Sequence, residues 1–548
     1  MRRPPHSLLS KLLPAFALPI LLTACGGSKD KGDPPPAPTA ACKVLRVTPE
    51  ASVTAGFIDP LMTVVYSSEK AGACDDIALV DKAMTKVPTA VVTANEWTNP
   101  DGGIVGTRTL EPVQPLRPGT PYALHLNGKT VTFFTTGTER RGSLVAVSDQ
   151  ALKLSPIPES AHVSRAAIDG VLDAFAERLA KHRPFEAALL KAMLRRELPH
   201  LARPDAKHGA HLSRITYRSA DSRGNPVTLS GLVIAPEQNL GGTPVDYNGM
   251  PVVVGQRGAI RDQADAPSLG ANAIAVPGLI AAAKGHLFLA PDLIGLGESA
   301  ALPQAYLVAA DTAAQTQDML RAVREHFLQK HLAKPGPDLR IIGASQGGYS
   351  AIAALPHLAR EGTIRMISVA EGPYDIYRTF NGPLLTAGGA APDAYALHED
   401  MSFLPSHVRD VMSSYKAYGN LPFDPAQVFS PDGQFLPAFL LSYTNRSQPD
   451  LVAQLGANTL AGTTQVYDLP QAQVKLYHFS TDSLVPAQNT TDLLASLSGA
   501  KHRFAGLQRG DCRESSELVK LVVKLSKSSL RTHTICVPFQ IDDFVAEL

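Results

Sequence analysis

Residues 339–355 read LRIIGASQGGYSAIAAL, and this stretch decides the fold. The apolar run LRII leads into the turn sequence GASQG, after which small residues recur at helical spacing. A strand, a tight turn and a helix are therefore predicted in that order. Such a turn projects the Ser345 hydroxyl above the end of the strand. Its neighbours must be small, because a larger Cβ would strike the flanking strand or helix.

This order is that of the nucleophile elbow of an α/β-hydrolase. Unalternated apolar runs at 251–254 and 286–290 predict further strands that are buried on both faces. A hairpin is expected from 215–219 and 227–234, and an amphipathic helix over 312–327. The predicted fold class is thus α/β, with a doubly wound, mostly parallel sheet. The alternative is an ordinary strand-to-helix turn with a solvated serine, since short glycine-serine patterns also arise by chance.

The length of the chain indicates how many domains it has, and its net charge bears on the partners to expect. The chain has 548 residues, so two or three domains are expected. The chain has 51 Lys and Arg and 50 Asp and Glu. Because its net charge is close to zero, the charge gives no reason to expect nucleic acid as a partner.

Residues 1–25 have the pattern of a targeting segment. A positive start and an apolar stretch at 12–22 end in Leu22-Thr23-Ala24-Cys25. This resembles the lipobox of bacterial lipoproteins, which implies cleavage, lipidation of Cys25 and export to the cell envelope, at the outer membrane or cell surface. An ordinary signal peptide is the alternative. Residues 26–40 are a polar, Pro-rich tether. The apolar stretch is too short to span a membrane.

Four cysteines remain after Cys25, two near each end of the chain. An even number in an oxidising compartment suggests disulfides. The expected pairs are Cys42–Cys74 and Cys512–Cys536, because each pair then falls inside one domain. Isolated buried thiols are the alternative.

The chain divides into three parts after the tether. Residues 41–138 carry short β-prone runs, and LRPGTPY at 116–122 with VTFFTTG at 131–137 resembles the end of a bacterial immunoglobulin-like domain. That resemblance implies a spacer or binding module. Residues 139–211 are expected to be a helical linker, and 212–548 the hydrolase domain. An insertion at about 375–472 is expected to be a helical cap, a lid lining an acyl pocket, or both.

Several motifs carry a family resemblance. These are Tyr217-Arg218 with Ser230-Gly231, Pro291-Asp292 with Gly295 and Gly297, the turn at 343–348, and EGPYD at 371–375. Together they resemble the secreted bacterial and fungal lipases and esterases related to the secretory lipase family. The resemblance implies an α/β-hydrolase fold, a serine triad and carboxylic ester substrates. We expect that this triad chemistry needs no cofactor.

Ser345 needs a histidine base, which a carboxylate must hold, and in this fold the chain order is Ser, acid, His. Asp482 follows the predicted strand 474–478 and is the expected acid; a turn aspartate capping a helix is the alternative. Glu371 is the reserve acid. Only His502 and His533 follow Asp482 in the chain. We expect His502 at the sheet edge and His533 as the base, although a surface histidine beside a disulfide is the alternative.

The oxyanion of an acyl-transfer intermediate needs backbone N–H donors. Gln346, just after the serine, should supply one. Ala259, in the sequence Arg257-Gly258-Ala259, should supply the other. No cluster of His, Asp and Glu has the sequence spacing of a metal site.

These expectations combine into a serine carboxylic-ester hydrolase with a small-molecule or lipid ester as substrate and the membrane as partner through its lipid anchor. Two alternatives stay open: a serine peptidase of the prolyl-oligopeptidase kind, and a surface-binding lipoprotein that has lost activity. Acyl-chain length, the alcohol and the oligomeric state do not follow from the sequence.

Overall fold

The structure is a computed structural model that describes residues 42–155, 157–173, 176, 184–238, 244–396, 404–482, 484–517, 519–520 and 532–548. The expected signal peptide, Cys25 and the tether 26–40 lie outside these residues. Among the described helices, none is both long and apolar enough to cross a bilayer.

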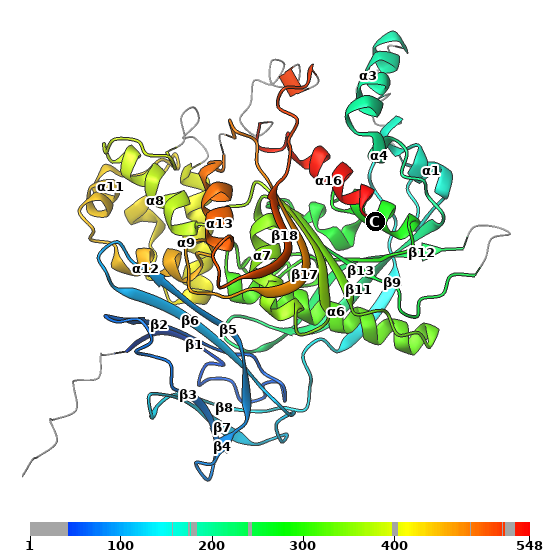
Figure 1. The fold of residues 1–548 in the computed structure, drawn as a ribbon. Helices are drawn as coiled ribbons and strands as arrows, with labels where there is room; N and C mark the ends of the chain where they lie inside the picture. Colours follow the sequence, from blue (N-terminus) through cyan, green and yellow to red (C-terminus); the bar gives the residue numbers. More distant parts are fainter. Residues whose placement is uncertain are drawn as a thin grey trace, which may run out of the picture. The chain divides into compact units, whose positions relative to one another are not determined.

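The first part of the described chain forms two four-stranded antiparallel sheets (Figure 1). One has the order β1 (Lys43–Thr48), β2 (Met62–Ser68), β6 (Ile104–Pro112), β5 (Thr89–Thr98), and the other β4 (Lys86–Val87), β3 (Ile77–Asp81), β7 (Pro121–Leu126), β8 (Lys129–Thr135). Side chains such as Tyr66, Leu124 and Phe134 share one buried cluster. The Cys42–Cys74 disulfide is confirmed. We call residues 42–135 the β module; its immunoglobulin-like character stays a prediction.

A ten-stranded mixed sheet follows, with the order β10-β11-β12-β14-β13-β15-β16-β17-β18 and β9 pairing with β11. The strands on the antiparallel side are β9 (Leu144–Asp149), β10 (His162–Val163), β11 (Gly209–Ala220), β12 (Pro226–Glu237) and β14 (Leu287–Pro291). From β14 onward the pairs are parallel, through β13 (Val252–Gln256), β15 (Asp338–Ala344), β16 (Thr363–Ala370), β17 (Asp468–Tyr477) and β18 (Arg503–Arg509). The structure has the predicted hairpin as β11 and β12 and the predicted buried strands as β13 and β14.

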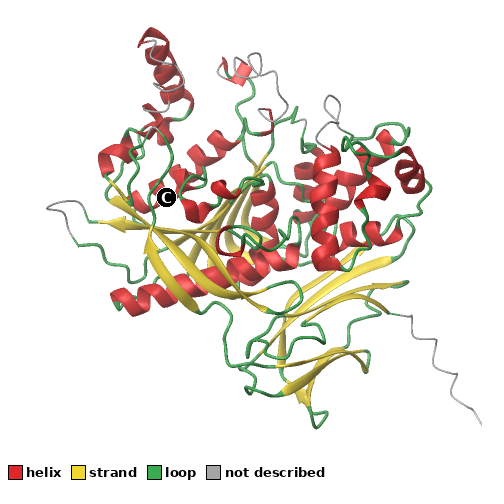
Figure 2. Cartoon of the chain, turned by 180° about the vertical axis from the view of Figure 1, so that it is seen from behind, coloured by secondary structure: helices red, strands yellow, loops and turns green. Residues whose placement is uncertain are grey.

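Helices cover both faces of this sheet (Figure 2). Because side chains alternate along a strand, Val252 and Val254 of β13 belong to one buried cluster and Val253 to the other. The first cluster includes α6 (Ala309–His331) and α7 (Gln346–Leu358), and the second includes α5 (Ala275–Ala283) and α16 (Val537–Ala546). The doubly wound arrangement expected from the sequence is therefore present.

The stretch 139–211, expected to be a helical linker, holds α1 (Arg165–Asp169), α3 (Pro184–Glu197) and α4 (Pro199–Ala202). It also supplies β9 and β10, which pair with β11 at the end of the large sheet. The run LVAVSD at 144–149 is β-prone. Its pairing partner lies more than sixty residues later in the chain, so local patterns alone did not reveal it.

The expected cap lies between β16 and β17. It consists of α8 (Ile376–Ala387), α9 (Leu404–Gly419), α10 (Pro425–Val428), α11 (Pro437–Thr444) and α12 (Pro449–Ala457). Cap residues such as Phe439 and Leu451 belong to the same buried cluster as α6 and α7, so the cap packs on the sheet domain. After β17, α13 (Gln488–Leu497) precedes β18.

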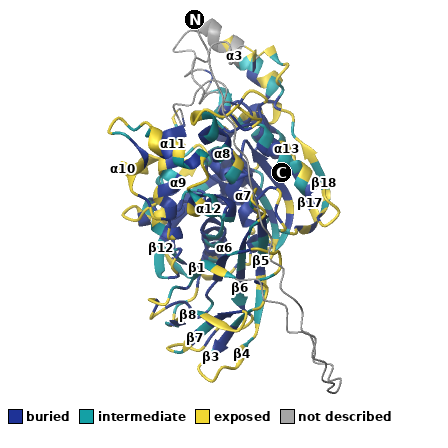
Figure 3. Cartoon of the chain, turned by 90° about the vertical axis from the view of Figure 1, so that its left-hand side faces the viewer, coloured by how far each residue is buried: buried dark blue, intermediate teal, exposed yellow. Residues whose placement is uncertain are grey.

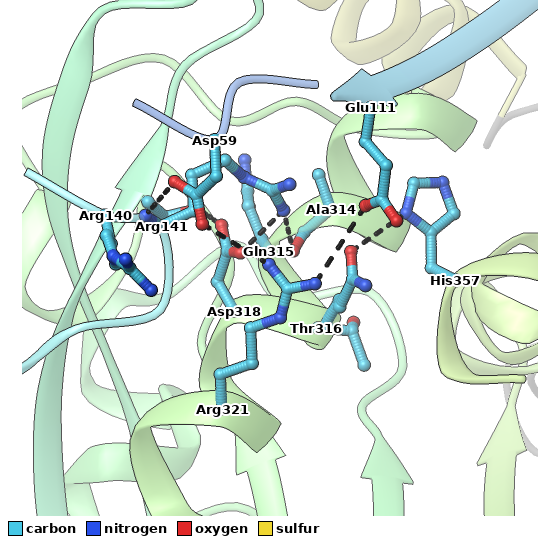
Figure 4. A network of polar contacts seen from close by, with 12 residues as sticks. Asp59, Glu111, Arg140, Arg141, Ala314, Gln315, Thr316, Asp318, Arg321 and His357 are labelled. Carbon is cyan, nitrogen blue, oxygen red and sulfur yellow. Dashed lines mark hydrogen bonds and ion pairs between the residues drawn. The ribbon is translucent and has the colours of Figure 1, made fainter. Parts of the chain in front are cut away.

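Arg141 connects the β module to helix α6 (Figure 4). Its backbone N–H donates to Oδ1 of Asp59 at 2.9 Å, and its Nη2 donates to Oδ1 of Asp318 at 2.6 Å. The other Asp318 oxygen accepts from the Ser219 hydroxyl at 2.6 Å. Both side chains of the ion pair are buried. Losing one partner would leave a buried charge uncompensated.

We expect Arg141→Ala to lower the free energy of unfolding by about 3–5 kcal/mol, the usual cost of breaking a buried ion pair from one side. Urea unfolding measures this. The matched control is Arg140→Ala, which removes the exposed neighbouring arginine and should change the value by less than about 0.5 kcal/mol. Equal stability of the two variants would contradict the role given to Arg141.

Candidate active site

The turn between β15 and α7 holds Ser345 in a conformation that few residues adopt. Ser345 has φ 56° and ψ −125°, and α7 begins at the next residue. A Cβ added to Gly343 would lie 2.6 Å from the carbonyl carbon of Gly347, and one added to Gly347 would lie 2.7 Å from the carbonyl oxygen of Arg257. Both positions therefore require glycine, as predicted. α7 itself is buried along almost its whole length (Figure 3).

Two hydrogen bonds join Ser345 to His533 and Asp482. Nδ1 of His533 lies 2.7 Å from Oδ2 of Asp482, and Nε2 lies 2.8 Å from Oγ of Ser345. His533 and Asp482 are buried. When Nδ1 carries the ring proton and donates it to Asp482, Nε2 accepts a hydrogen bond from the Ser345 hydroxyl. This geometry allows the imidazole to take the hydroxyl proton.

Backbone and histidine donors hold Asp482 in place. Its Oδ1 accepts from the N–H groups of Leu484 at 2.9 Å and Val485 at 3.0 Å. Its Oδ2 lies 3.3 Å from Nε2 of His478. Burial opposes ionisation, but His533 and His478 hold the pKa of Asp482 below its ordinary value. Asp482 is therefore the ionised partner of His533.

Sequence reasoning did not single out His478. It is buried at the end of β17, where Nδ1 contacts the Thr490 hydroxyl at 2.7 Å and Nε2 contacts the Val485 carbonyl oxygen at 2.8 Å. It thus braces the loop that carries Asp482. Its position four residues before Asp482, at a strand end, is the signal that could have revealed it.

The reserve acid, Glu371, lies beside Asp482 and His533. One oxygen from Glu371, one from Asp482 and one nitrogen from His533 lie within 4.8 Å of one another. Oε1 of Glu371 accepts from the backbone N–H of Cys536 at 3.3 Å. Burial raises the pKa of Glu371 well above its ordinary value, and the charge of Asp482 adds to the rise. The environment therefore favours the neutral form of Glu371 more than it does that of Asp482.

Of the two histidines that follow Asp482, His533 reaches Ser345. Nδ1 of His502 instead accepts from the backbone N–H of Tyr467 at 3.1 Å, just before β18. The confirmed Cys512–Cys536 disulfide ties the loop of His533 to the chain that follows β18. Residues 518 and 521–531, between this disulfide's first cysteine and His533, lie outside the described residues.

Arg257 braces the two segments that carry the expected oxyanion donors. Its Nη1 donates to the carbonyl oxygen of Gly258 and to Oε1 of Gln346, both at 3.0 Å. Its Nε donates to the carbonyl oxygen of Asp292 at 3.0 Å. Gln346 is the first residue of α7, where backbone N–H groups have no acceptor inside the helix. Ala259 and Gln346 line the same cavity as Ser345.

Ser230 and Asp292, which belong to the family motifs named above, contact each other next to Arg257. The Ser230 hydroxyl donates to Oδ2 of Asp292 at 2.5 Å, and the backbone N–H of Ser268 donates to Oδ1 at 2.8 Å. Asp292 is fully buried. Arg257 in turn donates to the Asp292 carbonyl oxygen. Asp292 therefore connects β12, through Ser230, to the loop 257–259.

A cavity of about 510 Å³ opens at Ser345 and His533. Its size is that of a small-molecule site. The walls are mainly apolar, and they include Ile260, Leu307, Phe380, Leu404, Leu484 and Val485. Phe380 and Leu404 belong to the cap, so the cap contributes to the wall. Met401 and Phe403, also expected in the cap, lie outside the described residues.

No known protein family and no curated protein sequence matches this chain. Among solved structures, a hydrolase candidate from Legionella pneumophila matches with a TM-score of 0.50 and 18% identity over 74% of this chain and 97% of that chain. The rice cell wall degrading esterase LipA from Xanthomonas oryzae gives 0.49 and 19%, over 72% and 98%. Candida antarctica lipase A gives 0.38 and 11%, over 68% and 78%. With the sheet order and the elbow, the first likeness establishes an α/β-hydrolase fold for residues that follow the β module.

Proposed function

We propose that this chain is a serine carboxylic-ester hydrolase of the lipase or esterase type. The observation that carries the proposal is the hydrogen-bonded series Asp482, His533 and Ser345 at the wall of an apolar cavity. A serine hydroxyl is a weak nucleophile until an adjacent base removes its proton. Here the base and its orienting carboxylate lie within hydrogen-bond reach.

In the first half of the reaction, Oγ of Ser345 attacks the ester carbonyl carbon while Nε2 of His533 takes the hydroxyl proton. The carbonyl oxygen becomes an oxyanion, and the N–H groups of Gln346 and Ala259 are the proposed donors to it. The intermediate then collapses. The C–O bond to the alcohol breaks, His533 returns the proton to the leaving alcohol, and an acyl-enzyme on Ser345 remains.

Water completes the cycle. His533 takes one proton from the water as its oxygen attacks the acyl carbon, and the second tetrahedral intermediate releases Ser345, which regains the proton. The products are a carboxylic acid and the free enzyme. Asp482 stays ionised and stabilises the imidazolium that forms twice in each turnover.

We further infer that the chain is exported and anchored through a lipid on Cys25, with the β module as an immunoglobulin-like spacer or binding unit. The two disulfides suit an oxidising compartment. The anchor would keep the cavity near a membrane or cell surface, where lipid esters are available.

Wild-type protein should hydrolyse p-nitrophenyl esters, and Ser345→Ala should lose at least about three orders of magnitude in kcat, as for removal of a triad member. The measurement is initial rates over esters of increasing acyl length, beside amino-acid p-nitroanilides. The matched control is Ser350→Ala, which removes a buried hydroxyl on the same helix. It should retain activity within a few-fold.

The same panel separates the alternatives. Faster cleavage of the anilides than of the esters would identify a peptidase of the prolyl-oligopeptidase kind. No Ser345-dependent turnover of any substrate would identify an inactive, surface-binding lipoprotein.

The pH dependence should follow His533. Burial alone would lower its pKa, but the Asp482 carboxylate raises it from 6.5 to about 9. The base acts in its neutral form, so activity is lost as pH falls below this pKa. We therefore expect kcat/KM to rise with pH, with a midpoint above 6.5, in rates measured at the isosbestic wavelength of nitrophenol.

Asp482→Asn tests the cause of the raised pKa. Without the carboxylate charge, burial dominates and the midpoint should move to lower pH, while the maximal rate falls by about 10⁴. His502→Ala, which removes a histidine outside the site, should leave the midpoint unchanged. An unshifted midpoint in Asp482→Asn would show that another group controls the profile.

A further inference from the structure

Four side chains with metal-binding atoms come from four neighbouring strands of the large sheet. They are Asp149 at the end of β9, His162 in β10, His211 in β11 and Glu237 at the end of β12. No motif in the sequence joins them, because they are spread over 89 positions from 149 to 237. The site lies outside the Ser345 cavity and does not depend on the proposed function.

Strand register places all four on one face of the sheet. His162 faces His211 directly across the β10–β11 pair. Asp149 pairs with the residue two positions after His211, and Glu237 with the residue two positions before it. Side chains two positions apart share a face, and directly paired residues also share one. The grouping therefore follows from the backbone pairing.

The side chains also contact one another. Nδ1 of His162 lies 2.7 Å from Oε1 of Glu237, and Nε2 of His211 lies 2.9 Å from Oδ1 of Asp149. The two imidazole rings stack with centroids 4.7 Å apart and planes 9° apart. One donor atom each from Asp149, His162 and His211 lies within 4.8 Å of the other two.

We propose that Asp149, His162 and His211 bind a divalent transition metal ion of the Zn²⁺ class, and that Glu237 orients His162. Histidine nitrogen and carboxylate oxygen are ligands that Zn²⁺ accepts, with bonds of about 2.0–2.2 Å. Tetrahedral ligands at such bond lengths lie roughly 3.3 Å apart. The His211–Asp149 contact has only to open by a few tenths of an ångström to admit the ion.

Glu237 has the place of the carboxylate that commonly supports a metal-binding histidine. Such a carboxylate accepts the proton of one ring nitrogen and leaves the other nitrogen for the metal. Since Glu237 contacts Nδ1 of His162, Nε2 is the atom that this ring offers. Three protein ligands would leave the fourth position to water. Imidazole ligands favour Zn²⁺, Cu²⁺ or Ni²⁺ over Mg²⁺ or Ca²⁺.

A bound ion would stabilise the pairing of β9 and β10 with β11 at the edge of the sheet. β10 has two residues and two register pairs with β11, so few backbone hydrogen bonds hold it. An ion that binds the folded chain but not the unfolded chain stabilises the fold by mass action. Four strand spacings separate β11 from β15, which is about 19 Å. The ion therefore would not act on Ser345.

Isothermal titration of chelator-treated full-length protein with ZnCl₂ tests the proposal. We expect one ion per chain with a micromolar Kd, and a rise in Tm on adding the ion. The double variant His162→Ala/His211→Ala should bind at least 100-fold more weakly. Glu237→Gln should weaken binding by about 10–100-fold, the usual effect of losing a supporting carboxylate.

Two further variants locate the ion. His331→Ala is the matched control. His331 is close enough to His211 for the His211 charge to lower its pKa, but it is outside the proposed ligand set. This variant should bind Zn²⁺ normally. Glu371, Asp482 and His533 form a second, buried group of possible ligand atoms. His533→Ala removes the histidine of that group. It too should bind normally.

Circular dichroism and the metal-free Tm establish that each variant is folded. Absence of binding by the folded wild type, a Kd in the millimolar range, or binding that the double variant retains would overturn the proposal. In each of these cases the four residues form two hydrogen-bonded pairs, His162 with Glu237 and His211 with Asp149. Loss of binding in His331→Ala or His533→Ala would also overturn it, by assigning the ion to another group.

Discussion

The hydrogen-bonded series from Asp482 through His533 to Ser345 is the constraint on which the account of the α/β-hydrolase fold's candidate site depends. It joins three segments that are 188 and 51 residues apart in the chain. Each is held by separate means: glycine packing at Ser345, backbone donors and His478 at Asp482, and the Cys512–Cys536 disulfide near His533. A reactive hydroxyl requires all three supports at once, because the hydrogen bonds tolerate errors of only a few tenths of an ångström.

The second carboxyl beside this series has a physical consequence. Two carboxylates so close together cannot both ionise at low cost. Asp482 has several donors and Glu371 has few, so the environments push their pKa values in opposite directions. Of the two carboxyl groups, Asp482, whose Oδ2 faces His533, is therefore the one whose surroundings favour ionisation. Glu371 also contacts the backbone of Cys536, which connects the end of β16 to the loop of the histidine.

Local patterns were sufficient to predict the elements around the elbow. The apolar runs at β13, β14 and β15 and the hairpin β11–β12 each have a signal within a few residues. The cap was expected only from the length of the insertion between two predicted strands. Chain order restricted the base to His502 or His533, and the structure brings His533 to Ser345. The roles of these residues in catalysis, and the lipid anchor, stay predictions. Contacts that join distant strands had no local signal: the pairing of β9 and β10 with β11, the brace by His478, and the cluster around His211 all depend on register.

The central claim is that His533 activates the Ser345 hydroxyl. Reaction with a fluorophosphonate, followed by intact-protein and peptide mass spectrometry, tests this most directly, because the probe bonds to activated serines whatever the natural substrate. We predict one adduct per chain, on Ser345, formed at a rate that His533→Ala lowers by at least about three orders of magnitude. An adduct on another residue, no adduct, or an equal rate in the variant would contradict the account.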